Sequence, residues 1–180
     1  NVLVGCDASG LELRMLAHYM KDENYVRTVT EGSSKDGTDV HTVNQRAAGL
    51  STRDNAKTFI YAFLYGAGDA KIGTIVGGNS KDGAKLKEKF LAQTPALARL
   101  LNRVAKQATT GWVPGLDGRR IWVRSEHAAL NSLLQGAGAI VMKKALVIFN
   151  DKIKLNKWPV KLVANVHDEF QFEVPEKLAE

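Results

Sequence analysis

Two acidic positions far apart in the chain could bind divalent cations. Asp7 ends the apolar run that opens the sequence, and Asp168 and Glu169 stand between a hydrophobic segment and an alternating one. If these segments are neighbouring strands, Asp7 and Asp168 lie side by side and repel each other unless cations lie between them. Two Mg²⁺ ions about 4 Å apart could activate a hydroxyl and stabilise a leaving pyrophosphate. Either aspartate alone would more often only begin a turn.

Basic and aromatic side chains recur at every fourth position between these carboxylates. They are Arg53, Lys57, Tyr61 and Tyr65, followed by Gly66. On a helix they share one face, which drifts by about 40° and rises by about 6 Å at each step. Such a face, roughly 18 Å long, matches an extended nucleotide, with cations for its phosphates and rings for its base. The alternative is a half-exposed helix with two solvated cations above a hydrophobic core.

Capping and turn signals outline the elements that position these residues. We expect a buried strand over residues 1–6, a mobile polar loop over 21–38, and a long helix from Ser125 to about Phe149. The other expected helices are those over 11–20, after Thr38 or Asp39, from Ser51 or Thr52 to Gly66, over 81–91 and after Pro95. Two hairpins are expected, at 116–119 and at 161–174. The turn of the second hairpin carries His167, Asp168 and Glu169.

Composition is consistent with a polyanionic partner. The chain has 25 Lys and Arg residues against 19 Asp and Glu residues, a formal net charge of +6. This balance favours nucleic acid, although an ordinary basic protein explains it equally well. Cys6 is the single cysteine and lies in an apolar run, so we expect a buried, reduced thiol in a cytosolic protein. No segment reads as the roughly 18–20 apolar residues of a membrane span, so no membrane partner is expected.

Taken in order, these segments resemble the motifs of family A (DNA polymerase I-like) DNA polymerases. The resemblance covers nearly the whole chain and is closest to the replicative polymerases of short-tailed phages. Residues 7–14 resemble motif A, residues 53–66 resemble motif B, residues 166–169 resemble motif C, and residues 38–42 and 124–135 resemble further blocks of that family.

The resemblance implies template-directed DNA synthesis, in which a deoxynucleotide passes from a dNTP to a primer 3′-hydroxyl by a two-metal mechanism. The implied partners are primer–template DNA and dNTP, and the implied cofactor is a pair of Mg²⁺ ions. Asp7 and Asp168 would be the catalytic metal ligands, and the Val4 or Ala8 carbonyl would add an oxygen. Glu169 would belong to the same catalytic group beside them.

The same resemblance implies how the nucleotide is bound. Arg53, His41 and Lys57 would hold the triphosphate, and Lys57 would also donate a proton to the leaving pyrophosphate. Tyr61 would stack on the incoming sugar and base. Tyr65 would lie near the templating base.

Sugar selection and DNA contacts complete the implied site. Glu12 would fill the space that a ribose 2′-hydroxyl needs, which would favour DNA over RNA. Arg124, Asn131 and Gln135 would donate to the minor-groove acceptors present in every correct base pair. His167 would approach the primer-terminal phosphate. An Asn and a Gln one helical turn apart are otherwise only a polar stripe.

We therefore expect a mixed α/β (α+β) fold, the right-hand polymerase core, with an antiparallel palm sheet and a helical fingers insertion. Residues 1–24 would begin the palm, 25–123 would form the fingers, and 124–180 would complete the palm. Both ends interrupt a structural pattern, so we interpret the chain as a truncated piece of a longer protein. In isolation it should be inactive, because it lacks the thumb, through which a processivity factor would bind. The expected location is the cytoplasm of a phage-infected bacterial cell.

Two alternatives remain open. A single-subunit phage-type RNA polymerase also uses strand-end aspartates and a Lys–Tyr helix, although Glu12 and Glu169 argue against it. A non-catalytic basic nucleic-acid-binding domain would bind DNA in a salt-dependent way but would be indifferent to Mg²⁺ and to loss of Asp7.

Overall fold

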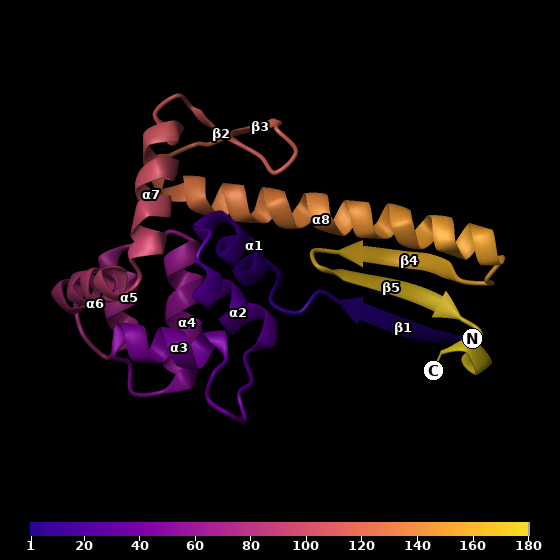
Figure 1. Ribbon diagram of the computed structural model, residues 1–180, viewed down its shortest axis with the longest axis horizontal. Coiled ribbons are helices and arrows are strands. Elements are labelled where there is room, and N and C mark those ends of the chain that lie inside the picture. The colour runs from indigo at the N-terminus through magenta and orange to yellow at the C-terminus, as the bar shows by residue number, and fades with distance from the viewer. Residues whose placement is uncertain (180) are drawn as a thin grey trace.

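A computed structural model describes residues 1–179. It has a helical part and a three-stranded sheet, and the long helix α8 (Glu126–Asn156) runs along both of them (Figure 1). Seven helices make up the helical part with the first half of α8. They are α1 (Leu11–Met20), α2 (Glu23–Glu31), α3 (Val40–Ala48), α4 (Arg53–Leu64), α5 (Asp69–Ile75), α6 (Ser80–Gln93) and α7 (Pro95–Ala108). The mixed fold with an antiparallel sheet and a helical insertion is confirmed.

The sheet has the order β1–β5–β4, and both strand pairs are antiparallel. Its strands are β1 (Val2–Asp7), β4 (Lys161–Val166) and β5 (Glu169–Val174). The central strand β5 buries Phe170, Phe172 and Val174. Phe170 and Phe172 pack with Met142 of α8 in a small core of their own. One covered face and one open face is the usual state of an antiparallel sheet.

The opening strand is not buried, which contradicts the sequence expectation. Most residues of β1 are exposed, and Cys6 is an exposed free thiol rather than a buried one. The physical reason is position: β1 pairs only with β5 and is an edge strand among residues 1–179. An apolar run indicates a strand but does not tell an edge strand from a central one.

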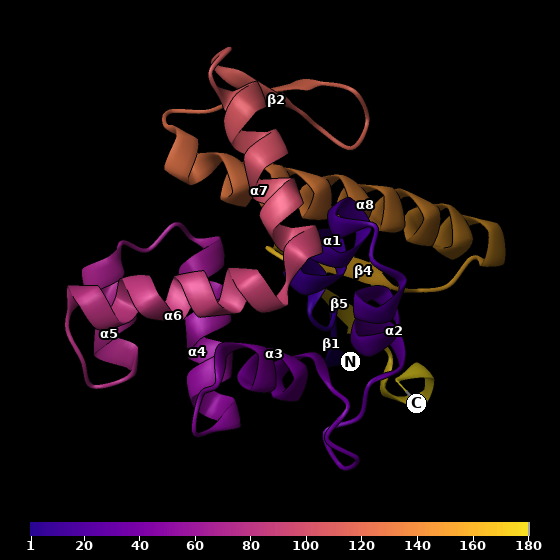
Figure 2. The ribbon, with the colours of Figure 1, turned by 60° about the vertical axis from the view of Figure 1, so that its left-hand side comes forward.

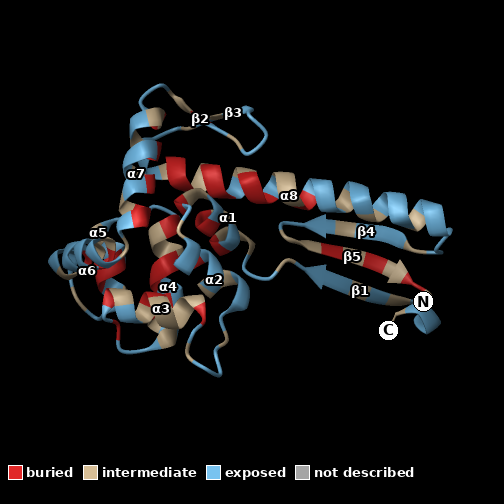
Figure 3. Ribbon diagram, in the orientation of Figure 1, coloured by how far each residue is buried: buried red, intermediate tan, exposed pale blue. Residues whose placement is uncertain are grey.

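The main core joins α1, α4, α6, α7 and the first half of α8 (Figure 3). The Phe59 and Phe90 rings meet edge to face, with centroids 5.1 Å apart, and thereby join α4 to α6. Edge-to-face contact is a favoured geometry for aromatic pairs. The largest fully buried side chains include Phe59, Phe90, Leu16, Ile60, Leu64, Ile72, Leu97, Leu100 and Leu134.

Helix boundaries follow the capping residues closely. Asp39 caps α3 and Thr52 caps α4, each with a side-chain oxygen that accepts a backbone N–H. The expected mobile loop over 21–38 is wrong, because it contains α2. Asp22 caps that helix, and Tyr25 is its one buried residue. A helix with a single buried side chain does not show the recurring apolar positions by which an amphipathic helix is recognised. Helix α5 was also not predicted.

The long helix α8 extends to Asn156, past the predicted end at Phe149. Ser125 precedes it, as predicted, but makes no side-chain capping hydrogen bond. By length and composition α8 could cross a membrane, so the expectation that no segment qualifies is wrong; 28% of its apolar window is buried in this fold. The core helix of a soluble protein passes the same test.

Both hairpins are present. Strands β2 (Trp112–Pro114) and β3 (Arg120–Trp122) form the first, above the start of α8 (Figure 2). The second joins β4 to β5 through His167 and Asp168, while Glu169 already belongs to β5 rather than to the turn. A short 3₁₀ helix (Glu176–Leu178) follows β5.

Candidate active site

The two predicted metal-binding aspartates lie at adjacent strand ends. Asp7 ends β1, and its pairing partner on β5 is Glu169. The Ala8 N–H donates to the Asp168 carbonyl at 2.9 Å, which joins the end of β1 to the β4–β5 turn. His167 adopts a left-handed conformation with φ of 54°, which allows this tight turn. The strand pairing therefore brings together two carboxylates that are far apart in sequence.

Glu169 lies beside Asp7, but its carboxylate is directed back along the sheet. Its Oε1 accepts a hydrogen bond from Gln171. A Cβ added to Gly5 would lie only 2.7 Å from the same oxygen, so the glycine makes room for it. This direction favours a supporting position for Glu169 over direct metal ligation.

The donor set fits Mg²⁺ of the kind that is shared with a substrate. Within residues 1–179 no three His, Cys, Asp or Glu side chains gather as a complete metal cage. Asp7 and Asp168 offer carboxylate oxygens, and Mg²⁺ is usually held by one or two carboxylates together with waters and substrate phosphates. Carboxylates at adjacent strand ends also gain from a cation, which relieves their repulsion.

A cleft of about 630 Å³ opens beside these strand ends. Four different parts of the chain form its walls: the start of α1, the end of α4, the middle of α8 and the β4–β5 turn. The lining residues are Gly10, Leu11, Glu12, Tyr61, Tyr65, Leu134, Gln135, Gly138, Ala139, His167 and Asp168. The small Gly138 and Ala139 had no signal in the sequence that would have assigned them to a site.

Glu12 and Tyr65 are joined across this cleft. The Tyr65 hydroxyl lies 2.9 Å and 3.0 Å from the two carboxylate oxygens of Glu12. Burial and the neighbouring Glu12 carboxylate raise the pKa of Tyr65 to about 12, so the phenol stays protonated and donates this bond. The bond holds the start of α1 against the end of α4.

Arg53 is held in place by Asp39. Its Nε and Nη2 donate to Asp39 Oδ1 at 3.0 Å and 2.8 Å, and Thr42 donates to Oδ2 at 2.6 Å. Burial alone would raise the pKa of Asp39, but the hydrogen bonds from Arg53, Thr42 and the His41 backbone lower it to about 2. The sequence indicated Asp39 only as a helix cap. An ion pair between the starts of two helices leaves no periodic pattern in the sequence, so it could not be predicted.

His41 lies near both Arg53 and Tyr61. Its ring centroid is 6.1 Å from that of Tyr61. Its Nδ1 is buried and finds no hydrogen-bond partner in the described part of the chain. Burial, followed by the positive charges of Arg53 and Lys57, lowers the pKa of His41. A buried polar atom without a partner usually marks a place where a ligand or water binds.

The structure brings the predicted site residues together unevenly. Glu12, Tyr61, Tyr65, Gln135, His167 and Asp168 line the cleft. Arg53 and Lys57 lie nearer the start of α4, and His41 lies at the start of α3. The other predicted residues outside the lining are Asp7, Glu169, Arg124 and Asn131.

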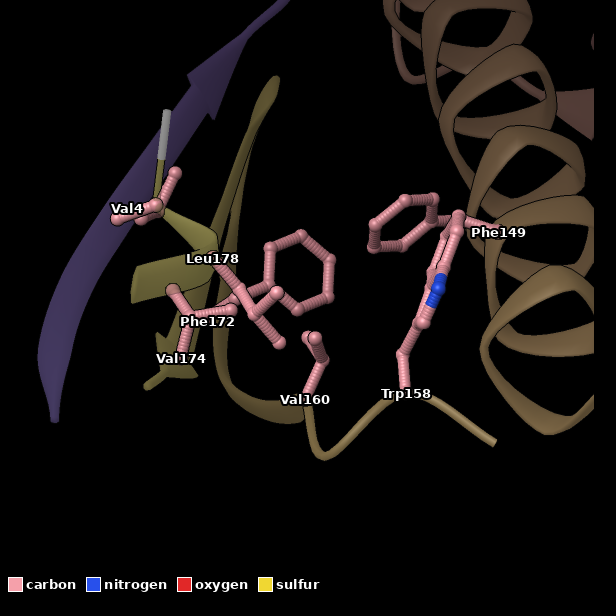
Figure 4. Close-up of a pocket in the computed structure, with 8 residues that line it drawn as sticks. Val4, Phe149, Trp158, Val160, Phe172, Val174 and Leu178 are labelled. Carbon is pink, nitrogen blue, oxygen red and sulfur yellow. The ribbon is translucent and has the colours of Figure 1, made fainter. Parts of the chain in front are cut away.

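A second pocket is apolar and lies away from these groups. It has a volume of about 350 Å³ between the sheet and the end of α8. Figure 4 shows Phe149 and Trp158 on one side of it and Phe172 on the other. Its lining offers no charged side chain for chemistry, so the cleft at the strand ends is the better candidate site.

The Asp39–Arg53 ion pair should make stability depend on pH. The pKa of Asp39 is about 2 in the fold against an ordinary 3.8. The pair therefore stabilises fully above pH 3.8 and is lost as the pH falls through 2. Asp39→Asn keeps a capping side chain but removes the charge. It should lower the free energy of unfolding at pH 7 by about 1–2 kcal/mol, since Arg53 is partly exposed.

Urea unfolding at pH 7 and at successively lower pH measures this difference. Asp69→Asn is the matched control, because it breaks a more exposed ion pair with Lys87 and should cost less than about 1 kcal/mol. A deficit for Asp39→Asn that stayed constant down to pH 2 would show that the charge is not the cause.

Comparison with known proteins identifies the family. A family model described as DNA polymerase family A matches residues 1–180. The DNA-directed DNA polymerase of Escherichia phage T7 is 46% identical over 195 residues, covering 94% of this chain and 27% of that protein. The polymerase of Escherichia phage Phieco32 is 43% identical over 208 residues, covering 96% of this chain and 33% of that protein. The chain thus spans a third or less of the length of these relatives.

A solved structure agrees with the sequence relatives. The polymerase domain of Pol1 from M. smegmatis, in complex with DNA primer–template and dNTP, superposes with a TM-score of 0.84 at 25% identity. The match covers 97% of this chain and 34% of that one. Sequence and three-dimensional fold point to the same family over nearly every residue, and on both grounds this chain belongs to DNA polymerase family A.

Proposed function

We propose that this chain is the catalytic core of a protein that performs template-directed DNA synthesis. The observation that carries the proposal is the placement of Asp7 and Asp168 at adjacent strand ends, beside a cleft that Asp168, Tyr61 and Tyr65 line. The named phage relatives and the primer–template and dNTP in the matched structure support the same reaction and partners. In this proposal residues 1–24 and 124–180 are palm, and residues 25–123 are fingers.

Asp7 and Asp168 would hold two Mg²⁺ ions. When bound, these ions lower the pKa of the primer 3′-hydroxyl and offset the charge of the departing pyrophosphate. The Ala8 carbonyl is the better candidate for a further oxygen ligand, since Ala8 directly follows Asp7. Val4 is paired with Phe172 inside the sheet, roughly 10 Å from Asp7 along the strand.

Arg53, His41 and Lys57 would bind the triphosphate. The primer 3′-oxygen forms a bond to the α-phosphorus, and the bond from that phosphorus to the bridging oxygen of pyrophosphate breaks. Lys57 would donate a proton to the pyrophosphate. His41 presents a buried Nδ1 that has no hydrogen-bond partner among residues 1–179, and Asp39 holds the Arg53 guanidinium in a fixed orientation.

The remaining site residues would position sugar, base and DNA. Tyr61 would stack on the incoming nucleotide, and Tyr65 would lie near the templating base. On the DNA side, Gln135 and His167 already line the cleft; Arg124 and Asn131 would extend that contact along the minor groove. The two named phage relatives support action inside an infected bacterial cell.

The direct test is extension of a labelled primer on a template by the full-length protein. Extension with dNTP and Mg²⁺, and its loss with a chelator, is the expected result. Preferential use of rNTP would instead favour the RNA polymerase alternative. DNA binding without any extension, unaffected by Mg²⁺, would favour a non-catalytic binding domain.

We expect Glu12 to determine the preference for deoxyribonucleotides over ribonucleotides. Glu12→Ala opens space for a 2′-hydroxyl, so it should raise the use of rNTP relative to dNTP by about tenfold or more. The measurement is the ratio of kcat/KM values for the two nucleotides. Because Glu12 also accepts a hydrogen bond from Tyr65, Tyr65→Phe is the matched control that removes the bond and keeps the carboxylate. A similar ratio for wild type and Glu12→Ala would remove Glu12 from this role.

A further inference from the structure

The β2–β3 hairpin has two unlike faces. Its register pairs Trp112 with Trp122, Val113 with Ile121, and Pro114 with Arg120. Because side chains alternate along a strand, both tryptophans and Arg120 share one face. Val113 and Ile121 share the other face. Val113 is only 1% exposed, and a Cβ added to Gly136 of α8 would lie 2.6 Å from Ile121 Cδ1. The inner face therefore attaches the hairpin to α8, and the outer face is free of that task.

The outer face combines a cation with two flat rings. The Arg120 guanidinium carbon lies 4.9 Å from the centroid of the Trp112 ring, a cation–π distance. Trp122 lies opposite Trp112 on the neighbouring strand and is 71% exposed. A large ring left this open to water on a small hairpin contributes little to folding. It is suited to contact another molecule.

The charge of Arg120 is also free. The adjacent Arg119 makes an ion pair with Asp117 at 2.6 Å, whereas Arg120 makes no ion pair with an acidic side chain of residues 1–179. Arg124, two residues beyond Trp122, is exposed as well. The hairpin thus offers a guanidinium already oriented on one ring, beside a second ring with an open face.

The hairpin is attached to α8 within one helical turn of the residues that line the cleft, and none of its own residues is part of that lining. Gly136 of α8 lies against the hairpin, while Gln135 and Gly138 of the same helix line the cleft. The hairpin projects from the side of α8 opposite the sheet (Figures 1 and 2). A strand that leaves the cleft past Gln135 would pass the turn of α8 to which the hairpin is attached.

We propose that the outer face of the hairpin binds single-stranded DNA, the unpaired part of the template outside the cleft. A base stacks on Trp122, and a phosphate binds Arg120, which Trp112 orients. Unpaired bases expose flat faces that any aromatic ring can stack on, without regard to sequence, and nearby cations follow the backbone. An acidic protein partner would use Arg120 and Trp122 as well, so the experiment below sets an oligoglutamate peptide against DNA. That the bound strand is the template rests on the proposed function. That the hairpin binds single-stranded DNA does not depend on it.

The experiment measures what a 5′ overhang adds to binding, which separates the hairpin from the cleft. The full-length protein is titrated at one salt concentration with primer–template DNA that has either a very short overhang or one of roughly ten thymidines. The long overhang should bind at least about fivefold more tightly, the gain expected from one stacked base. Trp122→Ala and Arg120→Ala should abolish the gain, and Trp122→Phe should keep most of it.

Controls make each outcome decisive. Trp158→Ala removes another exposed tryptophan, at the end of α8, and should leave the gain intact. The proposal is overturned if Trp122→Ala retains the gain, or if an overhang of abasic sites binds as tightly as thymidines. It is equally overturned if Arg120→Ala weakens only the binding of an oligoglutamate peptide. Asp7→Asn should still show the gain, so a failure of DNA synthesis and a failure of the hairpin are distinguishable.

Discussion

Asp168→Asn should lower primer extension by on the order of a thousandfold while leaving the affinity for primer–template DNA nearly unchanged. The amide keeps the size of the side chain but removes the charge of one of the two carboxylates that we propose as metal ligands. Several kcal/mol of transition-state stabilisation depend on cations at such a site. The turn itself should persist, because its link to β1 is a backbone hydrogen bond from Ala8 to the Asp168 carbonyl. Asp7→Asn should behave in the same way.

Glu169→Gln is the matched control for this prediction. Its carboxylate leans over Gly5 and accepts from Gln171, so its loss should reduce extension by less than about tenfold. Single-turnover extension and filter binding measure rate and affinity separately. Extension by Asp168→Asn within tenfold of wild type would refute the assignment of that residue as a metal ligand.

Tyr61→Phe should make the protein reject dideoxynucleotides by about tenfold or more relative to wild type. Tyr61 lines the cleft, and burial, with the Glu12 and Asp168 carboxylates, raises the pKa of its hydroxyl. The phenol therefore remains a hydrogen-bond donor at neutral pH. In wild type it can fill the polar gap left by a missing 3′-hydroxyl, an interaction worth roughly 1–2 kcal/mol.

Competition between dideoxynucleotides and ordinary dNTP on a primed template measures this discrimination. Tyr65→Phe is again the control. In wild type the Tyr65 hydroxyl is bonded to Glu12, so its loss should not change how the 3′ position of the nucleotide sugar is recognised. If wild type and Tyr61→Phe gave equal ratios, the Tyr61 ring would serve only to pack against the helical core.

The sequence predicted local features of this fold better than its contacts. The caps at Asp39 and Thr52 and the turn at His167 and Asp168 depend on a few neighbouring residues, so their signals are readable. The pairing of Asp7 with the β4–β5 turn was inferred because both carboxylates end apolar runs. The exposure of Cys6 was mispredicted, since the pattern of a strand does not show what covers it.

Contacts between distant elements were the main omission. Asp39 was recognised as a cap, but its ion pair with Arg53 depends on how α3 and α4 pack. The Glu12–Tyr65 bond spans 53 positions and joins residues that had been assigned separate tasks. Helix α2 was missed because Tyr25 is its one buried side chain. Such features arise only when the tertiary structure forms.

The Glu12–Tyr65 hydrogen bond has a consequence for how such a protein can evolve. Under the proposed roles, Glu12 excludes the ribose 2′-hydroxyl and Tyr65 lies near the templating base. A substitution of Glu12 that weakens this exclusion also removes the hydrogen-bond acceptor of the Tyr65 hydroxyl. Lineages that gained tolerance for altered sugars through Glu12 would therefore carry a changed spectrum of base errors as well. Restoring accuracy would then require a second substitution elsewhere in the gene.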